Sequence, residues 1–318
     1  MHVAIIGGAG TVGVSAGFDL AVSKPTIEIS LIDVDADAAR GHAIDLMHAR
    51  TMRCLPQFSG GRAPAPIRAG TYESMSVADA DCLAITASVP RPPDAAKRGG
   101  RAKFLHANRE MIISIADQVA DLPPKPTIIV TNPADRMAQL FWMSVGWPRA
   151  MIMGYSLSET ARTADWLSRH FDVAPTNIYC PVMGEHGEEV VPILSQASLG
   201  QEELRITEQE KSALRDYIRD VPYDVIQLRG EAETSRWVTG AGLSQIIKIL
   251  AGDVNPGRPL CLSTPVDGQY GIEDVCVSVP VQLGTEGVER IIEWPLTEEE
   301  LSGLHTAAES IEQDLVGS

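Results

Sequence analysis

The chain has 318 residues, 44% of them hydrophobic, and its 26 basic and 42 acidic side chains give a formal charge of −16. This length is sufficient for two globular domains, and the hydrophobic fraction excludes an intrinsically disordered chain. The excess of negative charge would repel a phosphate backbone or an anionic membrane surface, so neither nucleic acid nor a membrane is an expected partner.

Short apolar runs alternate with segments of helical length in the first half of the chain. The expected strands are, in chain order, residues 2–6, 26–32, 67–69, 82–86, 127–131 and 150–153. Each run is followed by turn residues and then by a helical pattern or a loop. This alternation is typical of βαβ units, and it predicts a doubly wound, mostly parallel sheet.

The pattern changes near residue 149. Longer helices are expected at residues 158–171, 207–228, 235–251 and 297–316, around antiparallel strands at 178–183, 258–266 and 275–283. The sequence therefore predicts an α/β protein in which residues 1–148 form the doubly wound domain and residues 149–318 form an α+β domain.

A glycine-rich turn directly follows the first expected strand. It contains the pattern G-x-G-x-x-G at Gly8, Gly10 and Gly13, with Thr11 and Val12 between the last two glycines. Such glycines permit a tight turn, a close approach of the backbone to a pyrophosphate, and packing of the following helix on the strand.

The second expected strand leads to Asp33, 20 residues after Gly13, where a carboxylate would accept a hydrogen bond from a ribose 2′-hydroxyl. No Arg or Lys follows before Arg40, so no basic side chain is placed to bind a 2′-phosphate. The pattern predicts a Rossmann domain that binds NAD rather than NADP. The alternative is a structural glycine turn followed by an exposed aspartate.

Residues 91–109 reverse the acidic character of the chain. One acid, Asp94, stands among six basic residues, which are Arg91, Lys97, Arg98, Arg101, Lys103 and Arg109. Because Gly99 and Gly100 allow hinge motion, the segment is interpreted as a lid that brings guanidinium groups to an anionic substrate. The alternative is a solvated basic loop.

Three further motifs carry groups suited to binding or catalysis. The Thr-Asn-Pro sequence at 131–133 ends the fifth expected strand, at the sheet edge where open α/β folds bind ligands. Glu159 and Arg162 are three residues apart on an expected helix, which places them on one face. His186 lies in the loop GEHG, and an imidazole suits proton exchange with a hydroxyl or carbonyl. Taken singly, Glu159 and Arg162 are more typical of an ordinary surface ion pair, and His186 is more typical of a solvated loop histidine.

Together these motifs resemble the lactate/malate dehydrogenase family over nearly the whole chain. The resemblance extends to GHAIDLMHA at 41–49, ITASVPRPP at 85–93, VTNPAD at 130–135 and a run at 268–300. The 24-residue spacing from Arg162 to His186 is also that of the family's substrate arginine and catalytic histidine. The resemblance implies a Rossmann domain followed by a substrate-binding catalytic domain.

The resemblance also implies a role for each matched residue. His186, paired with Glu159, would exchange the substrate's hydroxyl proton while a hydride moves between substrate and nicotinamide. Arg162 would bind the substrate carboxylate bidentately, and Arg101 would close over the site and polarise the carbonyl oxygen. Asn132 would contact both substrate and nicotinamide.

Three more positions follow from the same resemblance. Arg91 occupies the family's specificity position, where arginine goes with a second substrate carboxylate, as in malate and oxaloacetate. Asn108, seven residues after Arg101, is expected beside the cofactor, and Ser235 is expected in the wall of the substrate pocket.

The sequence departs from the family's pattern at three places. Glu159 replaces an aspartate that is one methylene shorter, and Ser88 stands where glycine is common. Arg91 and Arg101 are ten residues apart, where the family usually has six. These departures leave open whether Arg91 or a basic residue of the longer segment meets the substrate.

The sequence therefore predicts an NAD-dependent 2-hydroxy-acid dehydrogenase that acts on malate and oxaloacetate, with no metal site. One alternative is a dehydrogenase of a bulkier or lactate-type 2-hydroxy acid, which the long lid and Glu159 favour. An NAD-requiring glycoside hydrolase would need a Cys/His metal site, and GEHG contains no cysteine. A catalytically silent NAD-binding protein would predict the loss of His186 or Arg162.

Cellular setting and assembly are constrained less directly. The five cysteines are scattered without a C-x-x-C pair, so neither a disulfide framework nor a zinc site is expected. The sequence shows no export signal or membrane-length apolar stretch, so a cytoplasmic location is expected. The segment at 41–49 resembles a helix at the family's subunit contacts, which implies a homodimer or homotetramer.

Overall fold

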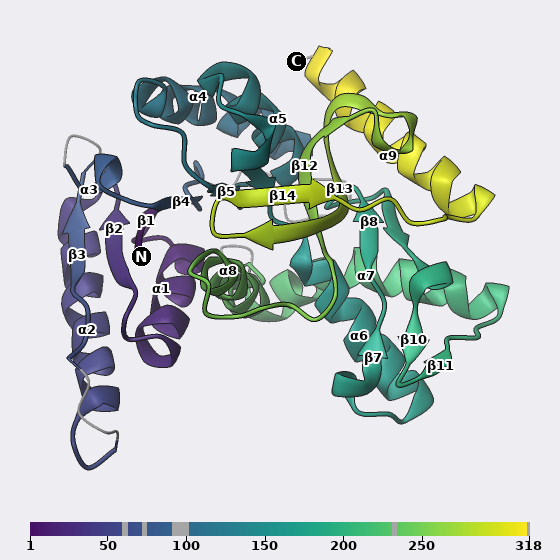
Figure 1. Ribbon diagram of the computed structural model, residues 1–318, viewed down its shortest axis with the longest axis horizontal. Helices are drawn as coiled ribbons and strands as arrows, with labels where there is room; N and C mark the ends of the chain where they lie inside the picture. Colours follow the sequence, from purple (N-terminus) through teal and green to yellow (C-terminus); the bar gives the residue numbers. More distant parts are fainter. Residues whose placement is uncertain (59–62, 72–74, 91–101, 231–233, 317–318) are drawn as a thin grey trace.

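The computed structural model describes residues 1–58, 63–71, 75–90, 102–230 and 234–316 (Figure 1). The N-terminal strands lie at one side of the view and the small strands β7, β10 and β11 at the other. Strands from the C-terminal half cross the middle of the molecule between them.

Six parallel strands form the first part of the main sheet, in the spatial order β3-β2-β1-β4-β5-β6. Their bounds are β1 His2–Ile6, β2 Glu28–Ile32, β3 Ile67–Gly70, β4 Cys82–Ile85, β5 Thr127–Ile129 and β6 Ile152–Gly154. The strand order reverses between β1 and β4, the kind of position where doubly wound sheets bind ligands at the carboxyl ends of their strands. The predicted parallel Rossmann sheet is confirmed.

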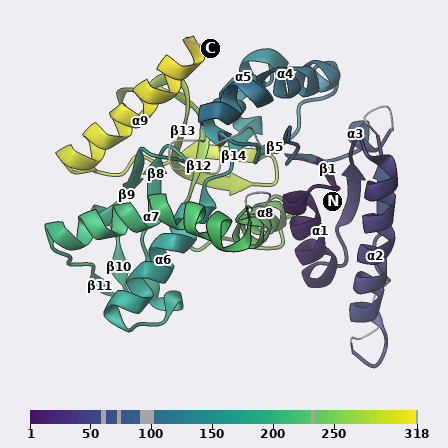
Figure 2. The same cartoon turned by 180° about the vertical axis from the view of Figure 1, so that it is seen from behind.

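Helices cover both faces of this sheet (Figures 1 and 2). Those of the first half are α1 Thr11–Ser23, α2 Ala36–Cys54, α3 Met75–Ala78, α4 Ala102–Val119 and α5 Ala134–Val145. Side chains alternate along a strand, so Val3 and Ile5 of β1 enter the core layer of α1 and α2, whereas Ala4 and Ile6 enter that of α4 and α5. All four are completely buried.

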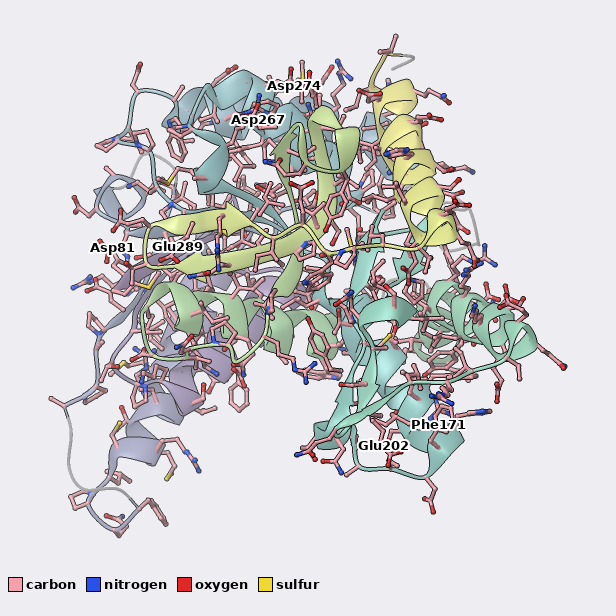
Figure 3. All side chains as sticks on the ribbon, turned by 45° about the vertical axis from the view of Figure 1, so that its right-hand side comes forward. Asp81, Phe171, Glu202, Asp267, Asp274 and Glu289 are labelled. Carbon is pink, nitrogen blue, oxygen red and sulfur yellow. The ribbon has the colours of Figure 1, made fainter. Side chains whose placement is uncertain are left out.

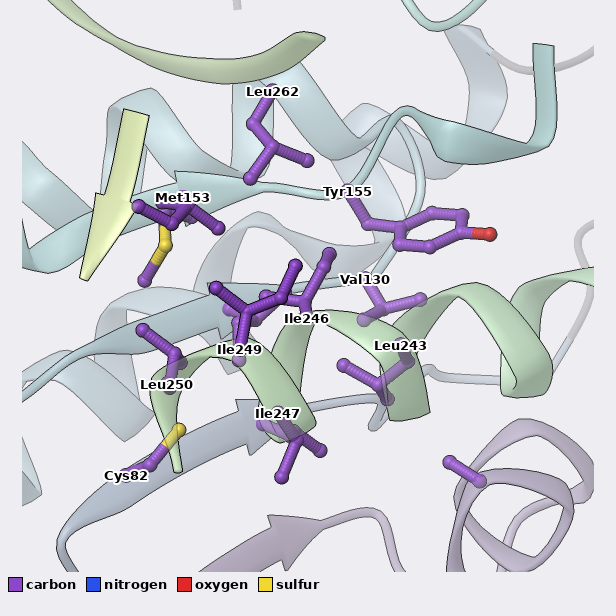
Figure 4. Packing of buried hydrophobic residues seen from close by; sticks show 14 of the residues in the cluster. Cys82, Val130, Met153, Tyr155, Leu243, Ile246, Ile247, Ile249, Leu250 and Leu262 are labelled. Carbon is purple, nitrogen blue, oxygen red and sulfur yellow. The ribbon is translucent and has the colours of Figure 1, made fainter. Parts of the chain in front are cut away.

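A helix from the second half completes the first of these layers. Leu243 and Ile247 of α8 Arg236–Leu250 lie in one apolar cluster with Cys82, Val130 and Met153 of the first half (Figure 4). The two halves of the chain therefore share a hydrophobic core.

The main sheet also continues into the second half. Ser263 pairs with Gly154 where β12 Leu260–Asp267 joins β6 in antiparallel fashion. The sheet then adds β13 Glu273–Gly284, β14 Gly287–Ile291, β8 Val182–Gly184 and β9 Val190–Pro192, giving eleven strands within the described residues. A smaller sheet comprises β7 Ile178–Tyr179, β10 Ser198–Leu199 and β11 Glu202–Glu203.

The helices of the second half confirm the expected pattern with small shifts at their ends. They are α6 Leu157–Phe171, α7 Glu208–Arg229, α8 and α9 Glu298–Val316, with single 3₁₀ turns η1 Arg149–Met151, η2 Pro175–Asn177, η3 Leu194–Gln196 and η4 Gln269–Gly271. Helix α7 begins with a capping box in which Thr207 and Glu210 each accept a hydrogen bond from the other's backbone N–H.

The expected single strand at 178–183 is wrong. The segment forms two strands, β7 and β8, which belong to different sheets. Pro181 lies between them and lacks the N–H group that a continuous ladder would need, so the chain changes sheets there. The division of the chain at residue 148 stays a prediction.

Exposed acidic side chains occur on several elements of the fold. Asp81, Glu202, Asp267 and Glu289 are all exposed and come from separate parts of the fold (Figure 3). Among the helices that the structure describes, none has the length and apolar character needed to cross a membrane.

Candidate active site

A cleft of about 760 Å³ lies along the carboxyl ends of β1, β4 and β5 and extends to residues of the second half. This volume lies in the range of small-molecule and cofactor sites. The sequence-predicted residues that line it are Gly10, Thr11, Val12, Asp33, Asn132, Arg162, His186 and Ser235. The fold therefore brings predicted residues from both halves of the chain, from Gly10 to Ser235, to one cleft.

The glycine-rich turn packs so closely that side chains are excluded. A Cβ atom at Gly8 would lie 2.8 Å from Leu31 Cα, and one at Gly13 would lie 2.5 Å from the Gly7 carbonyl oxygen. Gly8 and Gly13 thus allow the turn to pack against neighbouring backbone. Gly10 is the N-cap of α1 and lines the cleft. The first turn of α1 thus directs backbone N–H groups and the positive end of its dipole toward the cleft, which suits a pyrophosphate.

Asp33 has a fixed carboxylate at the end of β2. Oδ2 accepts a hydrogen bond from Ala9 N at 2.9 Å, and Oδ1 accepts one from Asp35 N at 3.1 Å. Each oxygen retains lone-pair capacity for a ribose hydroxyl. The described cleft residues beside it, Val34, Asp35 and Ala38, include no cation that would favour a 2′-phosphate.

Glu159, Arg162 and His186 form a buried, hydrogen-bonded group at the other end of the cleft. Glu159 Oε2 lies 2.6 Å from His186 Nδ1, and Glu159 Oε1 accepts a hydrogen bond from Arg162 Nη1 at 2.8 Å. The side chains of Glu159, Arg162 and His186 are only 3%, 10% and 9% exposed. The interpretation of Glu159 and Arg162 as an ordinary surface pair is therefore wrong, as is that of His186 as a solvated loop histidine.

Local structure explains how these three side chains meet. Glu159 and Arg162 are three residues apart in the first turns of α6, so they share a face of that helix. His186 follows β8, in a loop that α5 also contacts: Asp135 Oδ2 accepts a hydrogen bond from His186 N at 2.7 Å. The Tyr155 ring packs edge-on against the imidazole, with 6.2 Å between ring centroids.

Asp135 is an unusual carboxyl group at this site because it is completely buried. Burial raises the pKa of Asp135 to about 6, an effect that the nearby His186 and the hydrogen bond from its backbone N–H partly offset. Its Oδ1 atom has no hydrogen-bond partner among the described residues.

Two asparagines organise the middle of the cleft. Asn108 is fully buried, donates from Nδ2 to the Asn132 carbonyl oxygen at 2.8 Å, and accepts from Val89 N at 2.9 Å. Asn108 thus lies behind the cleft wall rather than in it. Asn132 lines the cleft, and its buried Oδ1 lacks a hydrogen-bond partner among the residues that the structure describes. An unsatisfied buried acceptor at this point suits a ligand that donates a hydrogen bond.

Four other positions singled out from the sequence are two arginines and two serines. Arg91 and Arg101 lie outside the described residues. Ser88 lines the cleft, where its hydroxyl donates to the Val89 carbonyl oxygen at 3.1 Å. Ser235 is the N-cap of α8 and also lines the cleft.

One wall of the cleft was missed by sequence reasoning. Pro222, Tyr223 and Ile226 of α7 line the cleft, and so do Thr234 and Thr239 beside Ser235. The proline inside a helical pattern was the available signal, because proline in a helix interior removes a hydrogen bond and so marks a special position.

The comparisons with known proteins agree with this geometry. Residues 1–154 match the family model of the lactate/malate dehydrogenase NAD binding domain, and residues 159–316 match that of the lactate/malate dehydrogenase alpha/beta C-terminal domain. An L-lactate dehydrogenase of Salinibacter ruber is 31% identical, over 96% of this chain and 93% of that protein. A malate dehydrogenase of Pyrobaculum aerophilum is 28% identical, over 96% and 95%.

Solved structures that resemble this chain also include both malate dehydrogenases and lactate dehydrogenases. The malate dehydrogenase from Aeropyrum pernix superposes with a TM-score of 0.85 at 25% identity, covering 99% of this chain and 98% of that one. A lactate dehydrogenase from a Medee basin deep-sea metagenome has a TM-score of 0.84 at 26% identity, covering 99% and 97%. With both domain models matched in order along one continuous fold, the chain belongs to the lactate/malate dehydrogenase family of NAD-dependent oxidoreductases.

Proposed function

We propose that the protein interconverts a small 2-hydroxy acid and its 2-oxo acid with NAD, and that malate and oxaloacetate are the substrate pair. The observation that supports this is the buried group of Glu159, His186 and Arg162, which shares one cleft with the glycine-rich turn. A proton-exchanging group, an anion-binding group and a dinucleotide-binding turn in one cleft are what this reaction requires.

The cofactor would bind along the first half of the cleft. Gly10, Thr11 and Val12 at the start of α1 would hold the pyrophosphate, and Asp33 would accept hydrogen bonds from the ribose. Asn132 would contact the nicotinamide end through its buried amide oxygen. When bound, NAD supplies the hydride acceptor or donor of the reaction.

His186 would move the proton. In this proposal the Glu159 carboxylate accepts a hydrogen bond from Nδ1, which would leave Nε2 to exchange a proton with the substrate oxygen. Glu159 fixes the orientation of the ring and stabilises the imidazolium that forms when a 2-hydroxy acid is oxidised. In reduction the same imidazolium returns the proton.

Arg162 would bind the C1 carboxylate of the substrate, because a guanidinium matches the fork of a carboxylate. This would fix the reacting carbon beside His186. Arg101 would polarise the substrate's carbonyl oxygen, and Arg91 would bind the second carboxylate of malate or oxaloacetate. Asn108 would support the cofactor site indirectly, through the Asn132 backbone.

A second candidate is a bulkier 2-hydroxy acid. The segment from Arg91 to Arg101 is longer than the corresponding segment of the family. Tyr223 and Ile226 of α7 also line the cleft. In this second candidate, the longer segment would go with a substrate that carries a larger group.

A panel of 2-oxo acids tests the proposal. We expect oxaloacetate with NADH to give the highest kcat/KM, exceeding pyruvate by at least about tenfold, because pyruvate lacks the second carboxylate that Arg91 would bind. NADPH should be the poorer cofactor with every acid. The initial rates of NADH oxidation compare the 2-oxo acids, and the initial rates of NADPH oxidation with the same acids compare the two cofactors. A higher kcat/KM for a bulky monocarboxylic 2-oxo acid would overturn the assignment of malate.

A further inference from the structure

The loop that carries His186 is held by two adjacent residues of α5. Asp135 Oδ2 accepts a hydrogen bond from His186 N at 2.7 Å, and Arg136 Nη1 donates one to Glu185 Oε1 at 2.6 Å. Both residues belong to the first turn of α5, which begins at Ala134. Consecutive residues of one rigid helix therefore contact consecutive residues of the loop.

The Glu185 carboxylate also closes the loop on itself. Its Oε2 accepts a hydrogen bond from Glu189 N at 3.2 Å, while Oε1 accepts the one from Arg136. The carboxylate lies so close to Gly187 that a Cβ atom there would be 2.5 Å from Glu185 Oε1. A side chain at Gly187 would therefore displace the Glu185 carboxylate from this position.

Arg136 connects this loop to the C-terminal helix. Its Nε donates to Asp314 Oδ2 at 2.7 Å, and its Nη2 donates to Ser310 Oγ at 3.1 Å, both on α9. The residue is only 4% exposed, so its charge is paired by Glu185 and Asp314 rather than by water. A buried guanidinium with three defined directions of hydrogen bonding fixes its partners in angle as well as distance.

We propose that Asp135 and Arg136 are positioning residues that fix the His186 imidazole against Glu159. The proposal rests on the role of His186 in the proposed function, and it adds a second contact, to the backbone that carries the ring. Glu159 orients the imidazole from α6, while Asp135 and Arg136 fix the backbone that carries it from α5.

The charges around His186 bear on how this can be tested. Charged and titratable side chains reach the loop from α5, α6, α7 and the segment before α6, and the loop carries others; they include Asp135, Arg136, Tyr155, Glu159, Arg162, Glu185, Glu188, Glu189 and Tyr223. Removing Arg136 alone would leave Glu185 as an uncompensated buried carboxylate, and such a loss can unfold a region. The test therefore uses the double variant Arg136→Met with Glu185→Gln, which removes both charges together.

The first measurement needs neither substrate nor cofactor. Hydrogen exchange of the ligand-free protein should become about tenfold faster or more in residues 185–189 of the double variant, while the strands β1 and β4 keep their protection. The second is steady-state kinetics, in which kcat should fall by about tenfold or more while KM for NADH stays within twofold, because only the proton-exchanging group is displaced. Arg136→Lys, which keeps the charge but not the fork, should lie between wild type and the double variant.

Arg149→Met provides a matched control. Arg149 also pairs with two carboxylates, Asp267 and Asp274, and neither of them belongs to residues 185–189. Its loss should leave exchange in 185–189 and kcat unchanged. The proposal is overturned if the double variant keeps wild-type exchange and kcat, or if protection falls equally in β1 and in the loop. If the wild type reduces no 2-oxo acid, the proposed function fails, and the exchange result still decides the role of Arg136.

Discussion

Glu159 uses its two carboxylate oxygens for two different partners, His186 at Oε2 and Arg162 at Oε1. A single negative charge thus stabilises both the group proposed to exchange a proton and the group proposed to bind the substrate. The extra methylene relative to aspartate gives the carboxylate the reach to contact both. We therefore interpret glutamate in place of aspartate at position 159 as compatible with a working site, because its carboxylate contacts both His186 and Arg162.

Shortening this side chain should separate the two contacts. We expect Glu159→Asp to lower kcat/KM for the preferred 2-oxo acid by about tenfold, because a displacement near 1 Å at such a site costs on the order of 10- to 100-fold. Glu159→Gln, which keeps the length but not the charge, should lower kcat further, since the imidazolium loses its counter-charge. Steady-state kinetics of the two variants, with His186→Asn as the inactive reference, measure these losses. A Glu159→Asp enzyme faster than wild type would contradict this account.

At the scale of single residues, the sequence predicted the residues proposed to bind or exchange protons better than the residues that position them. Arg162 and His186 were found because their residue types and spacing match a motif. The contact of Asp135 with the His186 backbone joins positions 51 residues apart and has no local signature. Only the folded chain shows which helix meets which loop.

Helix α8 is placed by close contacts that require glycine. A Cβ atom at Gly240 would lie 2.7 Å from Ser15 Cβ of α1, and one at Gly242 would lie 2.3 Å from the Tyr155 hydroxyl oxygen. That hydroxyl donates to the Val238 carbonyl oxygen of α8 at 3.1 Å. The helix is therefore fitted between α1, which begins at the glycine-rich turn, and Tyr155, which packs against His186.

Two glycine-to-alanine variants in helices should change stability in opposite directions. Gly242→Ala should destabilise the protein by about 1–3 kcal/mol, because the added methyl group overlaps the Tyr155 hydroxyl. Gly41→Ala is the matched control in α2: no atom lies within 4 Å of its Cβ position, so it should stabilise by about 0.5–1 kcal/mol through helix propensity. Denaturant unfolding curves of both variants measure the difference. Equal effects would exclude steric contact as the cause.

The elements themselves were largely predictable where periodicity is strong. All six strands of the parallel part and the four long helices of the second half were expected within a few residues of their observed ends. The break between β7 and β8 was not, because Cys180 and Pro181 interrupt the hydrogen-bonding ladder without interrupting the apolar pattern. The cleft wall on α7 was also missed, since its helical pattern does not reveal which face meets the cofactor domain.

At the scale of the whole molecule, the buried Asp135 makes stability depend on pH. The pKa of its carboxyl group is raised to about 6, mainly by burial, so the folded state holds this proton more tightly than the unfolded chain does. Stability from this group is present at low pH and is lost as pH rises from about 4 through about 6. Ionisation of Asp135 thus opposes folding at neutral pH.

The variant Asp135→Asn isolates this contribution because an amide does not titrate. The free energy of unfolding of the variant minus that of wild type should increase by on the order of 2 kcal/mol between pH 4 and pH 7.5, because only wild type loses stability as Asp135 ionises. Urea unfolding at several pH values gives this difference directly. A difference that stays constant with pH would show that the carboxyl group titrates normally. The pH-independent part of the difference in the free energy of unfolding between the variant and wild type reports only how well the amide packs and hydrogen-bonds in place of the carboxyl group.

The sharing of one core by both halves has a consequence for how the chain can be divided. Residues 1–148 contain the whole glycine-rich turn and most of the parallel sheet, yet they lack β6, α8 and the sheet's continuation through β12. A fragment cut there would expose the apolar face that Leu243 and Ile247 cover, together with an unpaired edge at β5. We therefore expect residues 1–148 not to fold on their own, because the second half of the chain completes their hydrophobic core.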